Sequence, residues 1–170
     1  GVDMSSGSLG QGISAAVGRA IAAKLRGDDY RVYTLLGDGE IQEGQVWEAS
    51  MLAAHRKLDN LVVIVDNNNL QIDGAITDVN SPYPIDKKFE AFNFHVINID
   101  GNDFDQIDAA FKEAKTVKGQ PTAIIAKTLK GKGVSYMENQ AGWHGKAPND
   151  EEYEIAMKEL EKAGEALCQM

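Results

Sequence analysis

Two hydrophobic patterns alternate along the chain. In the first, small and apolar residues recur at helical spacing, as in ISAAVGRAIAAKL (13–25). In the second, apolar and β-branched residues form runs of strand length. The continuous run NLVVIVDN (60–67) is typical of a parallel strand that is covered on both faces. The helical pattern occurs at 13–25, 44–56, 86–93, 102–117 and 151–167, and the strand pattern at 30–37, 60–67, 94–100 and 121–128.

This alternation predicts an α/β fold, a doubly wound, mostly parallel sheet with helices on both faces. A length of 170 residues fits one domain, 1–170, with a core of ordinary size. The pattern in 102–117 opens with a good N-cap. In the last helix we expect four apolar residues to face inward, namely Ile155, Leu160, Ala163 and Leu167.

Composition narrows the class of protein. Hydrophobic residues make up 43% and charged residues 25%, as in an ordinary globular protein, and no apolar run approaches the roughly 20 residues that span a bilayer. The net charge of −9 argues against nucleic acid or an anionic membrane as the main partner. The single cysteine, Cys168, excludes an intramolecular disulfide and suits a cytoplasmic protein. Because a glycine-rich stretch follows Gly1 almost at once, we expect a piece of a longer subunit.

Candidate chemistry lies where two predicted strands end. Asp38 stands between Gly37 and Gly39 after one strand, and Asn68 follows the next. In doubly wound sheets, ligands bind beyond the carboxyl ends of the strands. If these strands are neighbours, a carboxylate, a carboxamide and a free backbone carbonyl converge, and such oxygens suit Mg²⁺. The flanking glycines let the backbone approach a phosphate. Either segment alone is an ordinary turn or loop, but together they predict a magnesium–diphosphate site.

These motifs carry a family resemblance. GDGEIQEGQVWEA (37–49) followed by VDNNNLQIDG (65–74) resembles the thiamine-diphosphate fingerprint, with GDG and NN at the expected spacing. The EG pair, the EA pair and the closing IDG are similar to transketolase in particular. The resemblance extends from GSLGQG (7–12) to WHGKAPND (143–150), which is nearly the whole chain. It implies the pyrophosphate-binding domain of a transketolase, with thiamine diphosphate and Mg²⁺, or Ca²⁺ or Mn²⁺ as a substitute, as cofactors.

The resemblance assigns the metal and diphosphate ligands. The side chains of Asp38 and Asn68 and the backbone carbonyl of Leu70 correspond to the metal ligands. Gly39, with Gly37 before it, corresponds to the backbone that lies against the diphosphate.

Further roles follow from the same resemblance. Gly7 and Leu9 correspond to a loop that contacts the cofactor, and Leu9 supports its bent conformation. Ile72 corresponds to an apolar contact with the thiazolium ring. The remaining matches are His144, near the diphosphate and the substrate, and Glu43 and Glu48, two carboxylates of a network between active sites.

The implied activity is the transfer of a two-carbon ketol unit from a ketose phosphate to an aldose phosphate, in the pentose phosphate pathway. The glutamate that activates the cofactor belongs to a separate pyrimidine domain, and no segment here matches it. We therefore expect half an active site, completed by a complementary pyrimidine-domain chain in a homodimer or heterotetramer. Trp47, Met51 and Leu52 predict that 44–54 contributes to the interface.

Alternatives stay open at this point. The KGKG segment (130–133) is similar to 1-deoxyxylulose-5-phosphate synthase, so that enzyme or another thiamine-dependent enzyme is an alternative, and a cofactor-binding domain that is inactive alone also fits. The residues 10–15 fit a nicotinamide-type glycine motif, but no strand precedes them. Glu43 and Glu48 are also compatible with plain solvated charges, and we expect His55 and His95 to be structural.

Overall fold

The computed structural model describes residues 1–168 and has a four-stranded sheet at its centre. The strands are β1 (Val32–Gly37), β2 (Leu61–Asn67), β6 (Thr122–Lys127) and β5 (His95–Asp100), in that spatial order. All three pairings are parallel. The predicted parallel α/β architecture is confirmed, and the two strands that precede Asp38 and Asn68 are direct neighbours.

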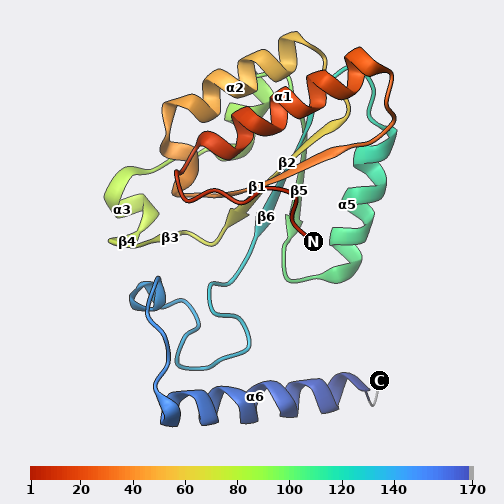
Figure 1. Ribbon diagram of the computed structural model, residues 1–170. Helices are drawn as coiled ribbons and strands as arrows, with labels where there is room; N and C mark the ends of the chain where they lie inside the picture. Colours follow the sequence, from red (N-terminus) through yellow and green to blue (C-terminus); the bar gives the residue numbers. More distant parts are fainter. Residues whose placement is uncertain (169–170) are drawn as a thin grey trace.

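Helices cover both faces of the sheet (Figure 1). On one face, α1 (Gln11–Arg26), α2 (Gly44–His55) and α4 (Ile85–Ala91) enclose the larger part of the core. On the other face, α5 (Phe104–Thr116) packs on β5 and its neighbours and forms a smaller core. The fold is therefore doubly wound, as the alternation of patterns predicted.

The central strand β2 explains why its sequence is apolar without interruption. Val63 and Val65 belong to the core under α1 and α2, whereas Val62 packs on the α5 side, and all three are fully buried. A strand buried on both faces gains from each apolar side chain, at about 25 cal/mol per Å² of apolar surface removed from water.

Helix ends follow the local sequence. The Asp103 carboxylate accepts the backbone N–H groups of Asp105 and Gln106 at 2.9 and 3.2 Å, so it caps α5. At the end of α1, Gly27 adopts φ 75° and donates its N–H to Ala23 and Lys24, a left-handed C-cap. The sequence predicted a cap at the start of 102–117, and Asp103 provides it.

Several short elements were not predicted. They are two 3₁₀ turns, a small antiparallel hairpin and a one-turn helix: η1 (Glu40–Gln42), η2 (Ala141–Trp143), β3 (Leu70–Gln71), β4 (Gly74–Ala75) and α3 (Ile76–Asn80). The hairpin follows Asn68 closely, so it extends the loop at the end of β2.

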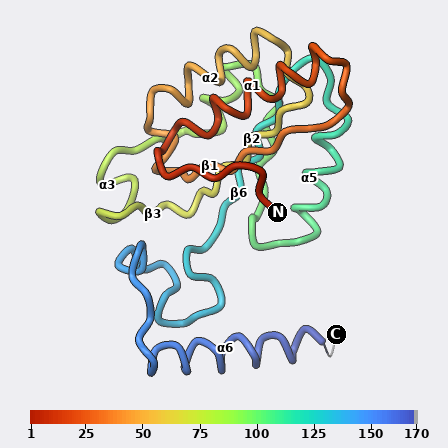
Figure 2. The backbone as a smooth tube through the Cα atoms, in the orientation of Figure 1, coloured from red at the N-terminus to blue at the C-terminus, as the bar shows by residue number. Residues whose placement is uncertain are grey.

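The orientation predicted for the last helix is wrong. In α6 (Asp150–Cys168), Ala156 is the one buried residue, whereas Ile155, Leu160 and Leu167 are 48, 44 and 72% exposed and Ala163 is exposed too. Figures 1 and 2 show α6 apart from the sheet, reached by the long loop that follows β6. The helix is amphipathic, but none of the described layers covers its apolar side. Among residues 1–168, no helix is both long enough and apolar enough to cross a bilayer.

Candidate functional site

The ends of β1 and β2 meet as the sequence predicted. Gly37 pairs in register with Asp66, and the backbone N–H of Asp38 donates to the carbonyl of Asp66 at 3.1 Å. The Asp38 carboxylate then accepts the N–H of Asn69, the residue after Asn68, at 2.6 Å. The turn after β1 and the loop after β2 are thus joined by the carboxylate that we assigned to a metal.

Asp38 is a buried carboxylate, 1% exposed, and its carboxyl oxygens lie in no ion pair with any described residue. Burial raises the pKa of Asp38 above its ordinary value. The N–H groups of Asn69 and Gly39 and, more weakly, the Lys130 ammonium act in the opposite direction, while Asp66 adds to the rise. A bound cation would remove this penalty, because it supplies the opposite charge at a dehydrated carboxylate.

The other two predicted metal ligands, Asn68 and Leu70, lie in the loop and the hairpin that directly follow β2. Asn68 Oδ1 accepts the N–H of Leu70 at 3.0 Å and keeps a second lone pair, while Leu70 begins the β3–β4 hairpin. Gln42 Nε2 on η1 donates to Gln71 Oε1 at 2.9 Å and ties the hairpin to the β1 side. One carboxylate, one carboxamide and one carbonyl fit a hard cation such as Mg²⁺. Within residues 1–168, no group of three or more His, Cys, Asp or Glu forms another metal site.

Neither glycine beside Asp38 is required by contacts within the chain. Gly39 has φ −68°, which any residue adopts, so a positive φ is not the reason for glycine there. A Cβ on Gly39 would lie 3.4 Å from the Cβ of Gln71, and one on Gly37 would lie 3.9 Å from the Cβ of Glu40. Glycine at position 39 keeps the turn free of a side chain between η1 and the hairpin, although the Gly39 N–H already acts on the Asp38 carboxylate.

The loop that contains Gly7 and Leu9 ends at Gly10, just before α1. Gly10 adopts φ 83°, and a Cβ there would lie 2.7 Å from the Cβ of Glu43. Gly10 donates its N–H to Glu40 Oε1 at 2.9 Å, and Gly37 donates its N–H to Glu40 Oε2 at 3.1 Å. The sequence analysis missed Glu40, because its hydrogen bond to Gly10 joins residues that are thirty positions apart.

Three other predicted residues are solvent-facing. Ile72, at the tip of the β3–β4 hairpin, is 67% exposed, so its side chain is free to contact a ligand. Glu43 and Glu48 are exposed at the start and on the outer side of α2. Their roles stay predictions. Trp47, which we assigned to an interface, instead packs inward on Phe89 and donates its Nε1–H to the Ile41 carbonyl at 2.9 Å.

His144 follows η2 and is exposed. Its Nδ1 lies 3.3 Å from Lys130 Nζ, and the Lys130 charge acts on Asp38. Lys130 is therefore the link between His144 and the end of β1. An ammonium group near a buried carboxylate, with an imidazole beside it, is compatible with an anion at this end of the sheet.

Tyr83 is a second residue that the sequence analysis missed. Its hydroxyl donates to Asn67 Oδ1 at 2.6 Å and lies 3.4 Å from Asn69 Oδ1, so it contacts both residues that flank Asn68. Burial, and secondarily the Asp38 carboxylate, raises the pKa of Tyr83 above its ordinary value. No sequence motif marks it, because it lies in the loop between α3 and α4.

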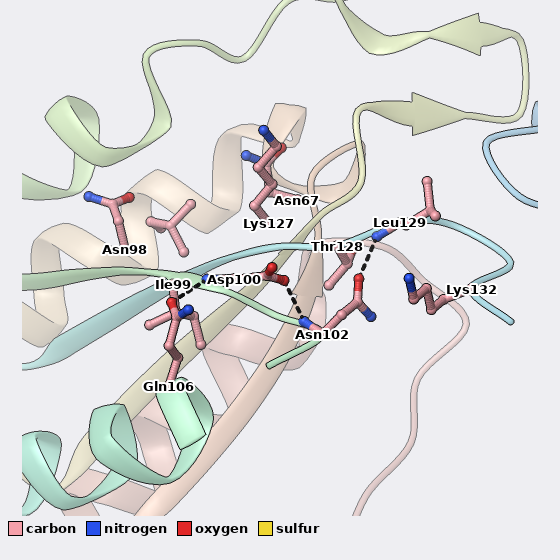
Figure 3. Close-up of a pocket in the computed structure, with 11 residues that line it drawn as sticks. Asn67, Asn98, Ile99, Asp100, Asn102, Gln106, Lys127, Thr128, Leu129 and Lys132 are labelled. Atoms are coloured by element: carbon pink, nitrogen blue, oxygen red, sulfur yellow. Dashed lines mark hydrogen bonds between the residues drawn. The ribbon is translucent and has the colours of Figure 1, made fainter. Parts of the chain in front are cut away.

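A cavity of about 660 Å³ adjoins this region at the carboxyl ends of β5 and β6. Figure 3 shows polar side chains around it, with Asn102 donating its N–H to Asp100 and accepting the N–H of Leu129. Lys127 and Lys132 also line it and belong to no ion pair within residues 1–168. Asn67, which Tyr83 contacts, connects the cavity with the end of β2.

This geometry defines a class of protein, an α/β domain with a buried carboxylate and a carboxamide at adjoining strand ends. Comparison with known proteins identifies the family. Residues 1–164 match the family described as transketolase, thiamine diphosphate binding domain. The chain belongs to the transketolase family.

Similar proteins carry transketolase names as well. The chain is 44% identical over 164 residues to the 6-deoxy-6-sulfo-D-fructose transketolase subunit of Clostridium sp. (strain MSTE9), covering 96% of this chain and 60% of that protein. It is 44% identical to one subunit of the apulose-4-phosphate transketolase of Actinobacillus succinogenes, covering 94% and 58%. The crystal structure of transketolase from Campylobacter jejuni matches with a TM-score of 0.87 and 38% identity, over 93% of this chain and 26% of that one. The chain thus spans little more than half the length of the two subunit-type relatives.

Proposed function

We propose that the chain, 1–170, acts as one domain that binds the diphosphate end of thiamine diphosphate through Mg²⁺ and supplies half of a transketolase active site. Bound thiamine diphosphate would supply the nucleophilic carbon that accepts a two-carbon ketol unit from a ketose phosphate and passes it to an aldose phosphate. The chain's own part is to bind and orient the cofactor and to guide an anionic sugar towards it.

One observation carries the proposal. The Asp38 carboxylate is buried at the end of β1, hydrogen-bonded to the loop after β2, and without a cationic partner among the described residues. Dehydrating a carboxylate is unfavourable unless a counter-charge is supplied. A divalent ion shared with a diphosphate supplies that charge, with Asn68 and the Leu70 carbonyl as its other protein ligands.

The position of the polar and apolar groups in the site indicates which part of the cofactor each would contact. Asp38, Asn68 and Gly39 hold the metal and the diphosphate, with His144 and Lys130 as neighbouring nitrogens. Leu9 and Ile72, 58 and 67% exposed, supply apolar contact to the rings. Both side chains gain burial when a ligand covers them.

Activity is proposed to need a second chain. Carbanion chemistry needs a carboxylic acid within hydrogen-bond reach of the aminopyrimidine. The acids near this site are Asp38, which is assigned to the metal, Glu40 and Asp66, which accept hydrogen bonds within the chain, and Glu43 and Glu48 on the α2 side. A complementary pyrimidine-domain chain is the proposed source of the missing acid, in a homodimeric or heterotetrameric cytoplasmic enzyme. The names of the subunit-type relatives support a two-chain arrangement.

The interface is proposed to include the outer side of α2. Met51 and Leu52 are 62 and 42% exposed there, on the helix that follows the turn that carries Asp38. Trp47 is not part of it, because it packs against the core. The substrate class is an anionic ketose. The two subunit-type relatives, named for 6-deoxy-6-sulfo-D-fructose and apulose 4-phosphate, support this class because each named sugar carries an anionic group.

A coupled assay tests this function. Xylulose 5-phosphate, 6-deoxy-6-sulfo-D-fructose and apulose 4-phosphate are offered as donors and ribose 5-phosphate as acceptor, with Mg²⁺ and thiamine diphosphate. The chain is assayed with and without a pyrimidine-domain chain of the same enzyme. We expect turnover only when both chains are present, because losing acid–base assistance costs on the order of 10²–10⁴-fold in rate. Turnover by the 170-residue chain by itself would contradict the half-site.

A further inference from the structure

Glu40 joins two segments that are far apart in the sequence. One carboxylate oxygen accepts the N–H of Gly10 at 2.9 Å, and the other accepts the N–H of Gly37 at 3.1 Å. Gly10 precedes α1 and follows Leu9, whereas Gly37 ends β1 and precedes Asp38. A single side chain therefore fixes the distance between the two parts of the candidate cofactor site.

Both N–H groups lack a partner in regular structure. The N–H groups of Val32 and Asp38 donate to the β2 side, so the N–H of Gly37, at an odd position of the same strand, points away from β2. Since β1 is at the edge of the described sheet, no strand receives that N–H there. The N–H of Gly10 lies at the start of α1, which has no side-chain N-cap of its own. The Glu40 carboxylate meets both needs and also lies at the positive end of the α1 dipole.

The fit between the segments is close. Gly10 adopts φ 83°. A Cβ built on Gly10 would lie only 2.7 Å from the Cβ of Glu43, so a larger residue would clash there. The loop that contains Gly7 and Leu9, the Leu9 loop, thus rests directly on the turn between η1 and α2. Within residues 1–168, the Glu40 carboxylate is the hydrogen-bonding group that links Gly10 to the end of β1.

We propose that Glu40 is a positioning residue that holds the Leu9 loop at a fixed separation from the Asp38 turn, so that the two bind opposite parts of one thiamine diphosphate. The inference rests on the proposed function for the identity of the ligand. In this role Glu40 would contact neither the metal nor the cofactor, because each of its carboxylate oxygens already accepts a backbone N–H. A pre-ordered loop binds more tightly, because less of the interaction energy is spent on ordering it.

The test uses Glu40→Gln, with Asp103→Asn as the matched control. Both changes turn a carboxylate that accepts two backbone N–H groups into a carboxamide, and Asp103 lies at the start of α5, away from Asp38. Amide hydrogen exchange of Gly10 and Gly37 is measured by NMR. Calorimetry gives the affinity for thiamine diphosphate over a series of Mg²⁺ concentrations.

For Glu40→Gln we expect exchange at one of the two amides to be at least about tenfold faster and at the other to rise less, because the carboxamide keeps one uncharged accepting oxygen and turns an NH2 donor towards the other N–H. We expect cofactor affinity to fall by about tenfold, with an unchanged dependence on Mg²⁺, since Asp38 and Asn68 are intact. Asp103→Asn is expected to keep parental affinity. Glu40→Asp, which is too short to reach both N–H groups, is expected to recover part of the loss.

Two outcomes would overturn the inference. If Gly10 and Gly37 exchange faster while cofactor affinity stays within about twofold of the parent, Glu40 only stabilises the fold. If neither amide changes, the bridge is absent. The proposed function fails differently, when the parent chain itself binds no thiamine diphosphate. In that case the Leu9 loop and the Asp38 turn have no shared ligand and the positioning role fails too, whatever the amides do.

Discussion

Replacing Asp38 with asparagine separates the metal role of this residue from its structural role. The carboxamide keeps the shape of the side chain and an oxygen that accepts the N–H of Asn69. It removes a negative charge from a site that is 1% exposed, where burial and the neighbouring Asp66 already disfavour that charge. The folded chain without cofactor should therefore lose no stability, and the free energy of unfolding should change by less than about 1 kcal/mol.

Cofactor binding by the Asp38→Asn chain, in contrast to its stability, should be strongly weakened. Two unit charges about 4 Å apart interact by about 4 kcal/mol at an effective dielectric constant of about 20. A ligand to a divalent ion lies closer, while desolvation offsets part of the gain. Loss of residues that only support metal ligands costs about 10–100-fold in affinity. For a direct ligand we expect at least a loss of about 100-fold, or about 2.7 kcal/mol.

Urea denaturation without Mg²⁺ and calorimetry with Mg²⁺ and thiamine diphosphate measure the two effects. Asp108→Asn, on the exposed side of α5, controls for the loss of one negative charge far from the site. An Asp38→Asn chain that binds the cofactor within a few-fold of the parent would refute the metal assignment. A chain that unfolds would refute the claim that the carboxylate is dispensable for folding.

Two further predictions test the fold around the site. Gly10→Ala should destabilise the chain by roughly 1–3 kcal/mol, because Gly10 has a φ of 83° and a Cβ there would clash with Glu43. Gly18→Ala, in open space within α1, should instead stabilise the chain by about 0.5–1 kcal/mol. Urea denaturation measures both variants, and equal changes in the free energy of unfolding would contradict the packing at Gly10. Burial raises the pKa of Asp59, but the Gly119 N–H at 2.9 Å and the Lys24 ammonium at 2.6 Å outweigh it and lower the pKa. Because the folded pKa is depressed, the stability from Asp59 is present above the unfolded pKa of about 3.9 and is lost as the pH falls through the folded value. Asp59→Asn should therefore lower the free energy of unfolding by about 1 kcal/mol at neutral pH, allowing for solvent screening of Lys24, and leave it unchanged below the folded pKa of Asp59. Urea denaturation at several pH values measures this difference, and a difference that does not depend on pH would contradict the role of Asp59.

The sheet could be predicted because its sequence signals are local. The run at 60–67 is apolar throughout because β2 is buried on both faces, and the turn at Gly37 to Gly39 follows directly from the end of β1. Neighbouring strands in a parallel sheet end at the same edge, so the sequence could place Asp38 and Asn68 together on the condition that their strands are neighbours, and the structure supplies that adjacency.

What could not be predicted depends on contacts distant in the sequence. The 3.6-residue period of α6 indicates an apolar side but does not say whether anything covers it, and Ile155 and Leu160 are exposed. The two-residue strands β3 and β4 are too short to show a period. The role of Glu40 depends on the N–H of Gly10, thirty residues away, and no spacing rule joins them.

The most direct test of the central claim is a calorimetric titration of the chain with thiamine diphosphate, first with Mg²⁺ and then with the metal removed by a chelator. Thiamine without the diphosphate is titrated in parallel. The site at Asp38 and Asn68 predicts saturable binding of thiamine diphosphate that needs the metal, and affinity at least about tenfold lower for thiamine, because the diphosphate completes the metal shell. Binding that is equally tight without metal or without the diphosphate, or no binding at all, would contradict a magnesium–diphosphate site at these strand ends.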